Sequence, residues 1–245
     1  MKYTDKIISI TIISIAVILS AIIVGSAYNT RGKTTNKIEV TGKAERNFTA
    51  DLIVWNGSFS KQKVEMKEAF KQLKADEILV KKYLLQKGIK EEEMVFSSVQ
   101  IQKVYDDSYD EKGRYNRKFR AYELRQEVNI SSQDINKIEK ISREVSELID
   151  MGVELTSDAP DFFYTKLSDL KLELIEEATQ DGRIRAEKIA QSAKAHLGNL
   201  LYANLGIFQI TAQNSNEDYS WGGAFNTKSK DKTASITVRL NFEAK

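Results

Sequence analysis

Residues 167–197, LSDLKLELIEEATQDGRIRAEKIAQSAKAHL, are predicted to form one long helix around which the rest of the chain is organised. The apolar and small residues recur at three- and four-residue steps and therefore share one helix face: Leu167, Leu170, Leu174, Ala178, Gly182, Ala186, Ile189, Ala193 and Leu197. The opposite side carries charged residues that favour water. The stripe needs a cover, which favours a domain of sheet and shorter helices.

This stripe is not straight along the predicted helix. Steps of four residues advance by about 40° each, so the path from Leu170 to Ala186 turns by roughly 160°. The first half is rich in Leu and the second in Ala, with Gly182 where they meet. We expect a bend near Gly182, or two halves with different neighbours. The Leu half would cover the domain's own sheet, and the Ala half would approach the other helices or a second copy of the chain.

Composition excludes several kinds of chemistry. The chain has 245 residues, 37 basic and 35 acidic, and a formal net charge of +2, so nothing in it favours nucleic acid as a partner. It has no cysteine, which rules out disulfides, thiolate metal sites and a cysteine nucleophile. With one histidine, any histidine-based site would depend on His196 alone. We therefore predict no metal and no cofactor.

The N-terminal segment is apolar and uncharged from Ile7 to Gly25, IISITIISIAVILSAIIVG. About 20 such residues span a bilayer core, so we predict a signal-anchor, a transmembrane helix, within residues 1–27. The alternative is a cleaved signal peptide with Gly25-Ser26-Ala27 as its site. Residues 28–36 are a predicted polar linker. Residues 37–245 form the predicted domain, outside the cytoplasm because N-terminal segments of this kind act as export signals.

Periodicity predicts seven strands and three helices in this domain. The strands are expected at residues 37–44, 49–60, 94–105, 119–130, 153–164, 200–211 and 233–244, and the helices at 64–87, 134–150 and 167–197. Gly88 and Gly152 should end the first two helices, with Ile89 and Val153 folding back on them. Ser131 and Asp134 are spaced as a capping box for the second helix. The predicted fold class is α+β: a largely antiparallel sheet of about seven strands with three helices on one face, preceded by the transmembrane helix.

The order and spacing of several short motifs resemble the SIMPL-domain family, which includes bacterial periplasmic immunogenic proteins. These motifs are Ile38-Glu39-Val40-Thr41-Gly42, Ala50-Asp51, Gly88-Ile89, Gly152-Val153, the helix with Ala178, Ala186, Ala190 and Ala193 leading to Leu197-Gly198, and the last strand, 233–242. The resemblance implies an α+β fold, a location in the cell envelope and, in some members, assembly into large ring-like or channel-like oligomers. It implies no catalytic residues.

The polar candidates each have a structural interpretation. His196 is expected at the C-terminal end of the long helix, where the helix dipole favours it. Basic residues interleave the acids Asp106, Asp107, Asp110 and Glu111, which favours a solvated hairpin tip over a calcium loop. Glu91, Glu92 and Glu93 are expected in a solvated turn.

The most distinctive polar connection contains DYSWGGAF at residues 218–225. Tyr219, Trp221 and Phe225 are more aromatic residues than a plain loop needs, and aromatic residues often anchor interfaces. We predict these three as a candidate interface. The alternatives are that Trp221 and Phe225 tuck back onto the domain, or that the aromatics stack on a sugar.

Together these features predict a non-enzymatic, membrane-anchored protein of the cell envelope. Its domain would act by self-association, as a homo-oligomer, or by binding other envelope proteins. One alternative is an extracytoplasmic ligand-binding or sensory domain that uses a cleft near the aromatic loop. A second is a hydrolase that uses carboxylates such as Asp51, Asp161 or Asp169.

Overall fold

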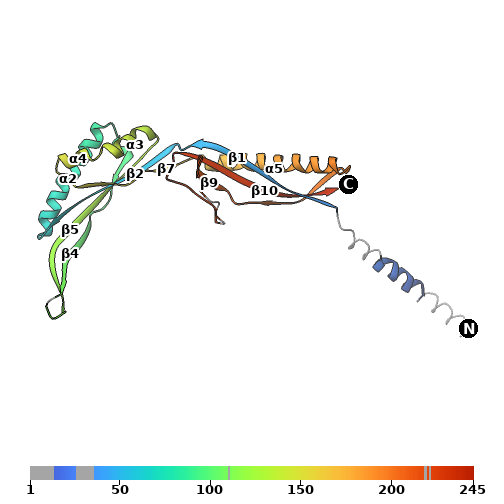
Figure 1. Cartoon of the computed structure of the whole chain (residues 1–245), viewed down its shortest axis with the longest axis horizontal. Coiled ribbons are helices and arrows are strands. Elements are labelled where there is room, and N and C mark those ends of the chain that lie inside the picture. Colours follow the sequence, from blue (N-terminus) through green and yellow to red (C-terminus); the bar gives the residue numbers. More distant parts are fainter. Residues whose placement is uncertain (1–13, 26–35, 110, 218–219, 221) are drawn as a thin grey trace, which may run out of the picture. The chain divides into compact units, whose positions relative to one another are not determined.

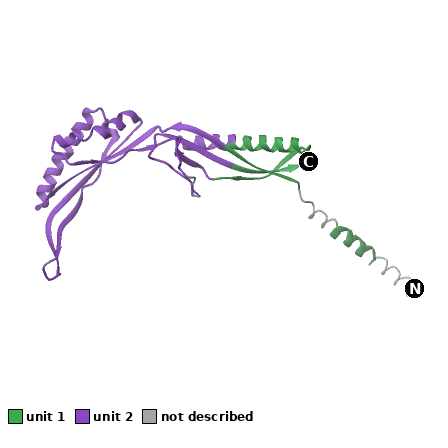
Figure 2. Cartoon of the chain, in the orientation of Figure 1, with its two compact units in different colours: residues 1–43, 178–206, 238–245 green, residues 44–177, 207–237 purple. Residues whose placement is uncertain are grey.

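The computed structural model describes residues 14–25, 36–109, 111–217, 220 and 222–245. The chain divides into two compact units (Figure 2), unit 1 with residues 1–43, 178–206 and 238–245, and unit 2 with residues 44–177 and 207–237. Figure 1 shows the elements in chain order: β1 Lys37–Thr49, β2 Leu52–Lys63, α2 Met66–Gln86, η1 Glu91–Glu93, β3 Met94–Phe96, β4 Gln100–Tyr109, β5 Tyr115–Ser132, α3 Ile135–Glu144, α4 Glu147–Asp150, β6 Leu155–Ser157, β7 Asp161–Phe163, α5 Leu167–Ser192, β8 Leu197–Leu205, β9 Gln209–Ala212 and β10 Asp231–Ala244.

Unit 2 contains a six-stranded antiparallel sheet with helices packed against it. The strand order is β3-β5-β2-β6, β4 also pairs with β5, and β7 also pairs with β2. The long β2–β5 ladder runs from Ile53↔Ser132 to Lys63↔Tyr122. Trp55, Phe59 and Leu124 from the sheet are buried in one cluster with Leu73 and Val80 of α2. Burying such large apolar side chains is the main stabilising contribution to this unit.

Both predicted glycine stops are confirmed. Gly88 has φ +85°, and the amide of Ile89 donates to the carbonyl of Leu84 at 3.1 Å. Gly152 has φ +82°, and the amide of Val153 donates to the carbonyl of Leu148 at 3.1 Å. Glycine adopts this left-handed conformation without the steric penalty of a Cβ atom.

The expected helix at residues 134–150 is divided into α3 and α4. Its N-cap is Asp134, whose side chain accepts from the amide of Lys137 at 3.2 Å. The serine that contacts this cap is Ser132 and not the expected Ser131: the hydroxyl of Ser132 accepts a hydrogen bond from the amide of Asp134.

A second antiparallel sheet has the order β1-β10-β8, with β9 also pairing with β10. In unit 1, α5 lies directly on this sheet. A Cβ atom at Gly42 of β1 would lie 1.9 Å from the carbonyl oxygen of Ala178 and 2.5 Å from the amide nitrogen of Gly182. A Cβ atom at Gly182 would lie 2.7 Å from Cδ1 of Leu240 on β10. Two glycines therefore allow backbone contact between helix and strand.

The buried face of α5 follows the predicted four-residue stripe from Leu170 to Ala186 and continues to Ala190. Residues at regular four-residue intervals are buried through both halves: Leu170, Leu174, Ala178, Gly182, Ala186 and Ala190. At Gly182 the Ala-rich half lies against the sheet, where Leu240 and Gly42 are its neighbours. Its expected contact with a second copy of the chain stays a prediction. Ile189 is 47% exposed, and α5 ends at Ser192, before Ala193 and Leu197.

The expected fold class is corrected in its sheet and in its membrane helix. The described residues form two antiparallel sheets rather than one sheet of about seven strands. Three expected strands are each divided, into β3 and β4, β6 and β7, and β8 and β9. The two sheets result from strand pairing: β1 pairs with β10 and not with β2, although only two residues separate β1 from β2. Local periodicity predicts a strand but does not specify which strand it pairs with.

The expected transmembrane helix at residues 7–25 is also corrected. Among the described residues, no helix is long and apolar enough to cross a membrane. Residues 14–25 are helical. Residues 7–13 and most of the expected linker at 28–36 lie outside the described residues.

Candidate functional site: an uncovered edge strand

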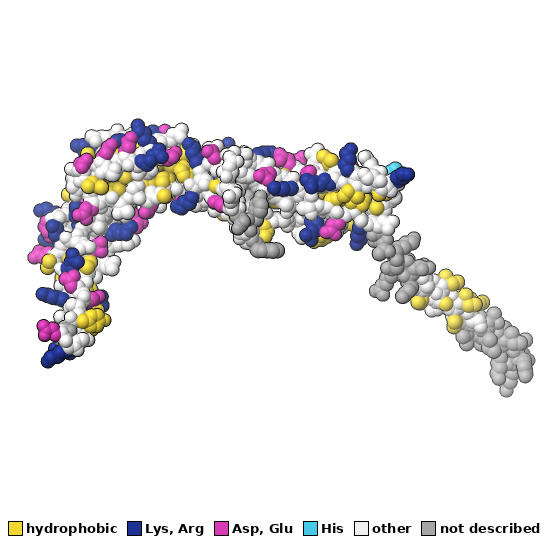
Figure 3. Space-filling view, viewed as in Figure 1, with side chains coloured by type: hydrophobic (Ala, Val, Ile, Leu, Met, Phe, Trp, Pro, Cys, Tyr) yellow, Lys and Arg dark blue, Asp and Glu magenta, His cyan; other side chains and the backbone are white. Residues whose placement is uncertain are grey.

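The strand β8 is exposed along most of its length. It forms one edge of the second sheet: it pairs with β10 on one side, and no described strand pairs with its other side. Leu200, Leu201, Tyr202 and Leu205 are between 46% and 54% exposed. Hydrophobic side chains accordingly reach the surface beside α5 in unit 1 (Figure 3).

The position of α5 explains the exposure of Leu205, which lies on the face of the sheet that α5 covers. The ladder pairs Leu240 with Ala203 and Val238 with Leu205, so these four side chains share one face of the sheet. Leu240 and Val238 are buried, and Leu240 lies against Gly182 of α5. Leu205 on the same face is 53% exposed. The helix therefore covers β10 and β1 and leaves β8 uncovered.

The two edges of this sheet differ in their protection against pairing with another strand. The sequence of β8, LGNLLYANL, contains no charged residue and no proline. In contrast, β1 carries exposed charged residues at Lys37, Glu39, Lys43 and Glu45. Edge strands are normally protected by such charges, by proline or by bulges. The β8–β10 ladder is regular from Leu205 to Tyr202 and shifts register only beyond it, so the second half of β8 is an unprotected edge.

The aromatic connection after β9 lies in unit 2, and part of it is described. Tyr219 and Trp221 lie outside the described residues. Phe225 is 57% exposed and forms an isolated bridge with Ile210. Its exposure does not agree with the tucked alternative for this residue, and its role at an interface stays a prediction.

Polar side chains fasten the base of this connection to β9. The side chain of Gln209 donates to the carbonyl of Ser220 at 2.8 Å and accepts from the amide of Ala224. Lys232, which is 2% exposed, donates to the carbonyl of Asn226. Burial lowers the pKa of Lys232 from its ordinary value of 10.5, and the nearby carboxylates Glu217 and Asp161 act in the opposite direction. The described ends of the connection are thus held in place.

The carboxylates suggested for catalysis have separate structural partners. Asp51 accepts from the amide and hydroxyl of Thr165, each at 2.7 Å, and so fixes the turn before α5. Asp161 accepts from the hydroxyl of Thr227 at 2.8 Å and pairs with Lys228 at 2.7 Å. Burial alone would raise the pKa of Asp161, but the hydrogen bonds from Lys228 and Thr227 outweigh it and lower this pKa. Asp169 lies exposed in the first turn of α5.

His196 is not at the helix end, where the sequence analysis placed it. It lies four residues beyond α5, directly before β8, and its backbone exchanges hydrogen bonds with that of Lys245 at 2.7 and 2.9 Å. The role of His196 in the described fold is to join the two strand ends.

The acidic clusters are tied to neighbouring groups. In the hairpin, Asp106 pairs with Arg120 and Asp107 with Arg117, while Asp110 lies outside the described residues. Glu93 is half-buried and accepts a hydrogen bond from the hydroxyl of Ser132. The turn at residues 91–93 is therefore packed against β5 at this residue and is not solvated throughout. Throughout the described ranges, no three His, Cys, Asp or Glu side chains are grouped so as to hold a metal ion.

Two antiparallel sheets with helices packed against them, and one uncovered edge strand, define an α+β protein whose most distinctive surface is that strand. The chain belongs to the SIMPL family, described as a "protein of unknown function (DUF541)", whose profile matches residues 38–242. This match confirms the resemblance noted in the sequence. No curated protein matches the chain.

β8 is not among the candidate sites predicted from the sequence. An apolar strand was expected at residues 200–211, with no prediction of its exposure. Two features of the sequence could have indicated an exposed edge strand. The nine residues of β8 contain no charge and no proline, and the last strand of the chain alternates polar and apolar residues. This combination indicates an edge only when the neighbouring strands are known.

Proposed function

We propose that this SIMPL domain is a non-enzymatic protein-binding module that self-associates through β8. A single observation carries the proposal: β8 is an uncharged edge strand with Leu201, Tyr202 and Leu205 about half-exposed. An unpaired edge offers backbone donors and acceptors to another strand, and its apolar side chains gain free energy when the new strand covers them.

The partner that fits this edge best is β8 of a second copy. A two-fold axis brings identical strands together in antiparallel fashion, so each copy covers the other's apolar edge. Pairing of β8 with β1 of another copy would instead place its apolar residues beside Lys37, Glu39 and Lys43. The symmetric pair is therefore the arrangement that we propose.

Size-exclusion chromatography with light scattering on the full chain, in a mild detergent, tests this pairing. The wild type should have twice the 27.8 kDa mass of the monomer. The double variant Leu201→Lys/Leu205→Lys should be monomeric, because it places like charges on both strands of the pair. The control Leu172→Lys/Ile184→Lys changes two exposed residues of α5 in the same way and should remain dimeric. A monomeric wild type, or an equal loss in the control, rejects the proposal.

The proposal includes a location outside the cytoplasm. It is supported by the uncharged apolar sequence at residues 7–25, which has the character of an export signal. Digestion of the domain by a protease added to spheroplasts is the expected result, and complete protection until the cells are lysed would contradict this location.

A further inference from the structure

A second surface lies on the outer face of α2, in unit 2. The buried residues of this helix, among them Leu73, Val80 and Leu84, define its inner face. At about 100° per residue, an outward arc of roughly 120° contains Lys67, Lys71, Lys74, Ala75, Ile78, Lys81, Lys82 and Leu85. This arc, the α2 outer face, has five lysines and no acidic residue. Glu68 and Glu77 lie at its borders.

The charge of this face is only partly neutralised. Lys74 pairs with Glu77, and Lys81 pairs with Glu91. For Lys67, Lys71 and Lys82, which are exposed, no ion pair occurs among the described residues. Surface ion pairs contribute about 0–1 kcal/mol, so the two paired lysines can also exchange their partners for another anion.

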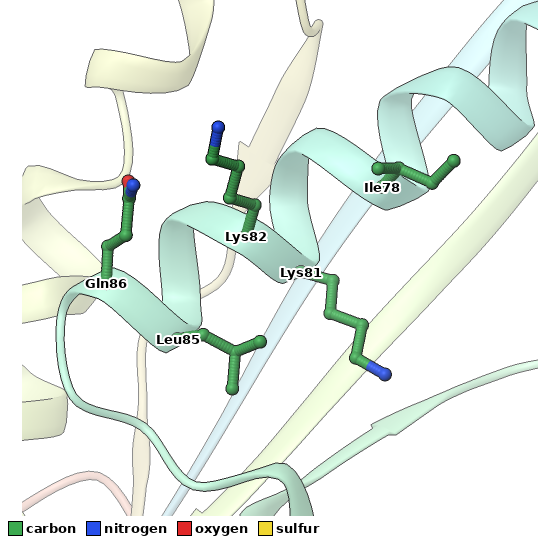
Figure 4. A pocket seen from close by; sticks show the side chains of 5 residues that line it. All are labelled: Ile78, Lys81, Lys82, Leu85 and Gln86. Carbon is green, nitrogen blue, oxygen red and sulfur yellow. The ribbon is translucent and has the colours of Figure 1, made fainter.

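Apolar side chains stand between these lysines. Ile78 is 67% exposed and Leu85 42% exposed, and with Lys81, Lys82 and Gln86 they line a shallow groove of about 440 Å³. In the view of Figure 4, Lys82 points toward the upper edge and Lys81 toward the lower edge, with Ile78 and Leu85 on the same helix. A second groove of about 510 Å³, near the start of α2, is lined by Phe70, which is 45% exposed, and by three lysines and two acidic residues: Lys67, Lys71, Lys74, Glu65 and Glu68. The lysines outnumber the acids there by one.

We infer that the α2 outer face docks on a lipid surface that contains anionic phospholipids. Charge complementarity supports this occupant, since each lysine near an anionic leaflet adds about 1 kcal/mol of attraction. The long lysine side chains can reach the phosphates while Ile78 and Leu85 enter the boundary of the acyl chains. A polyanion such as nucleic acid would satisfy the lysines but would leave these two apolar side chains in water.

Sedimentation of the full chain with lipid vesicles tests the charge. The probes are vesicles of phosphatidylcholine alone and of phosphatidylcholine mixed with phosphatidylglycerol. The wild type should prefer the anionic vesicles, and salt should weaken this preference. The variant Lys67→Gln/Lys71→Gln/Lys82→Gln should lose about a hundredfold of the anionic preference. The control Lys103→Gln/Lys118→Gln/Lys188→Gln removes the same charge from exposed positions elsewhere and should bind as the wild type does. The apolar residues 7–25 are common to all these proteins, so they do not contribute to the comparison.

Site-specific labelling tests the apolar contact. The chain has no cysteine, so one introduced cysteine carries the only label. Ile78→Cys and Leu172→Cys are matched sites, because each native residue is 67% exposed. A polarity-sensitive dye at position 78 should shift to the blue on anionic vesicles, and the dye at position 172 should not. Equal binding to neutral and anionic vesicles, equal losses in the two lysine variants, or no shift at position 78 each overturns the inference, and would leave an acidic protein as the partner to seek.

Discussion

At Gly42 the missing side chain lets α5 lie directly on β1. The Gly42→Ala variant places a Cβ atom 1.9 Å from the carbonyl oxygen of Ala178, so the helix or the strand has to move. Overpacking of this kind costs typically about 1–3 kcal/mol, and this contact is with rigid backbone, so we expect a loss of about 3 kcal/mol in the free energy of unfolding. Urea denaturation followed by circular dichroism measures it.

The control for this variant is Gly222→Ala. A Cβ atom there meets only the hydroxyl of Ser220, at 3.8 Å. Its free energy of unfolding should stay within about 0.5 kcal/mol of the wild type. If Gly42→Ala is equally well tolerated, the close approach of α5 to β1 is wrong.

The carboxylate of Asp161 gives stability that depends on pH. Its hydrogen bonds with Lys228 and Thr227 hold its pKa below the ordinary 3.8, so the folded state favours the ionised form. A depressed pKa contributes its full stability above the unfolded value and loses it as the pH falls through the folded value. Asp161→Asn should therefore be less stable than the wild type by about 1–3 kcal/mol at pH 7.

The same variant should approach the wild type in stability below about pH 4, as the wild-type carboxylate becomes protonated. Urea denaturation of both proteins between pH 7 and pH 2 tests this convergence. Other acids with lowered pKa values, such as Asp181 and Glu144, titrate in both proteins and cancel in the difference. A difference that stays constant with pH would contradict the role of the Asp161 charge.

At the scale of single elements, local sequence signals predicted most boundaries. The apolar stripe placed α2 at residues 64–87, and it spans Met66–Gln86. Gly88 and Gly152 were correct as helix ends, because a left-handed residue is a local requirement of the backbone. The expected last strand, 233–244, lies within β10, which has the alternating burial that its sequence predicts.

Relations between elements could not be predicted in the same way. The partner of β1 is β10, which lies almost 200 residues later and is chosen by tertiary packing rather than by periodicity. The exposure of Leu205 depends on where α5 lies over the sheet, which its own strand does not encode. The basic face of α2 could have been found by a helical projection of its lysines, because the positions of Lys67, Lys71 and Lys82 around the helix are a local property.

At the scale of the whole molecule, pairing through β8 would make thermal stability depend on protein concentration. A partner that binds only the folded state stabilises it by mass action, by about 2.7 kcal/mol at a hundred times the dissociation constant. For a chain of this size, each kcal/mol raises Tm by roughly 2–4 °C. The Tm of the wild type in detergent should therefore rise by several degrees between about 1 and 100 µM.

The variant Leu201→Lys/Leu205→Lys separates this linkage from the stability of the fold. Both side chains are about half-exposed in the single chain, so their replacement should change the Tm of the dilute protein little. Its Tm should then stay constant with concentration, and at the lowest concentration it should coincide with that of the wild type. A parallel rise in both proteins would mean that association uses a surface other than β8. A constant Tm in both would mean that the edge strand stays unpaired in solution.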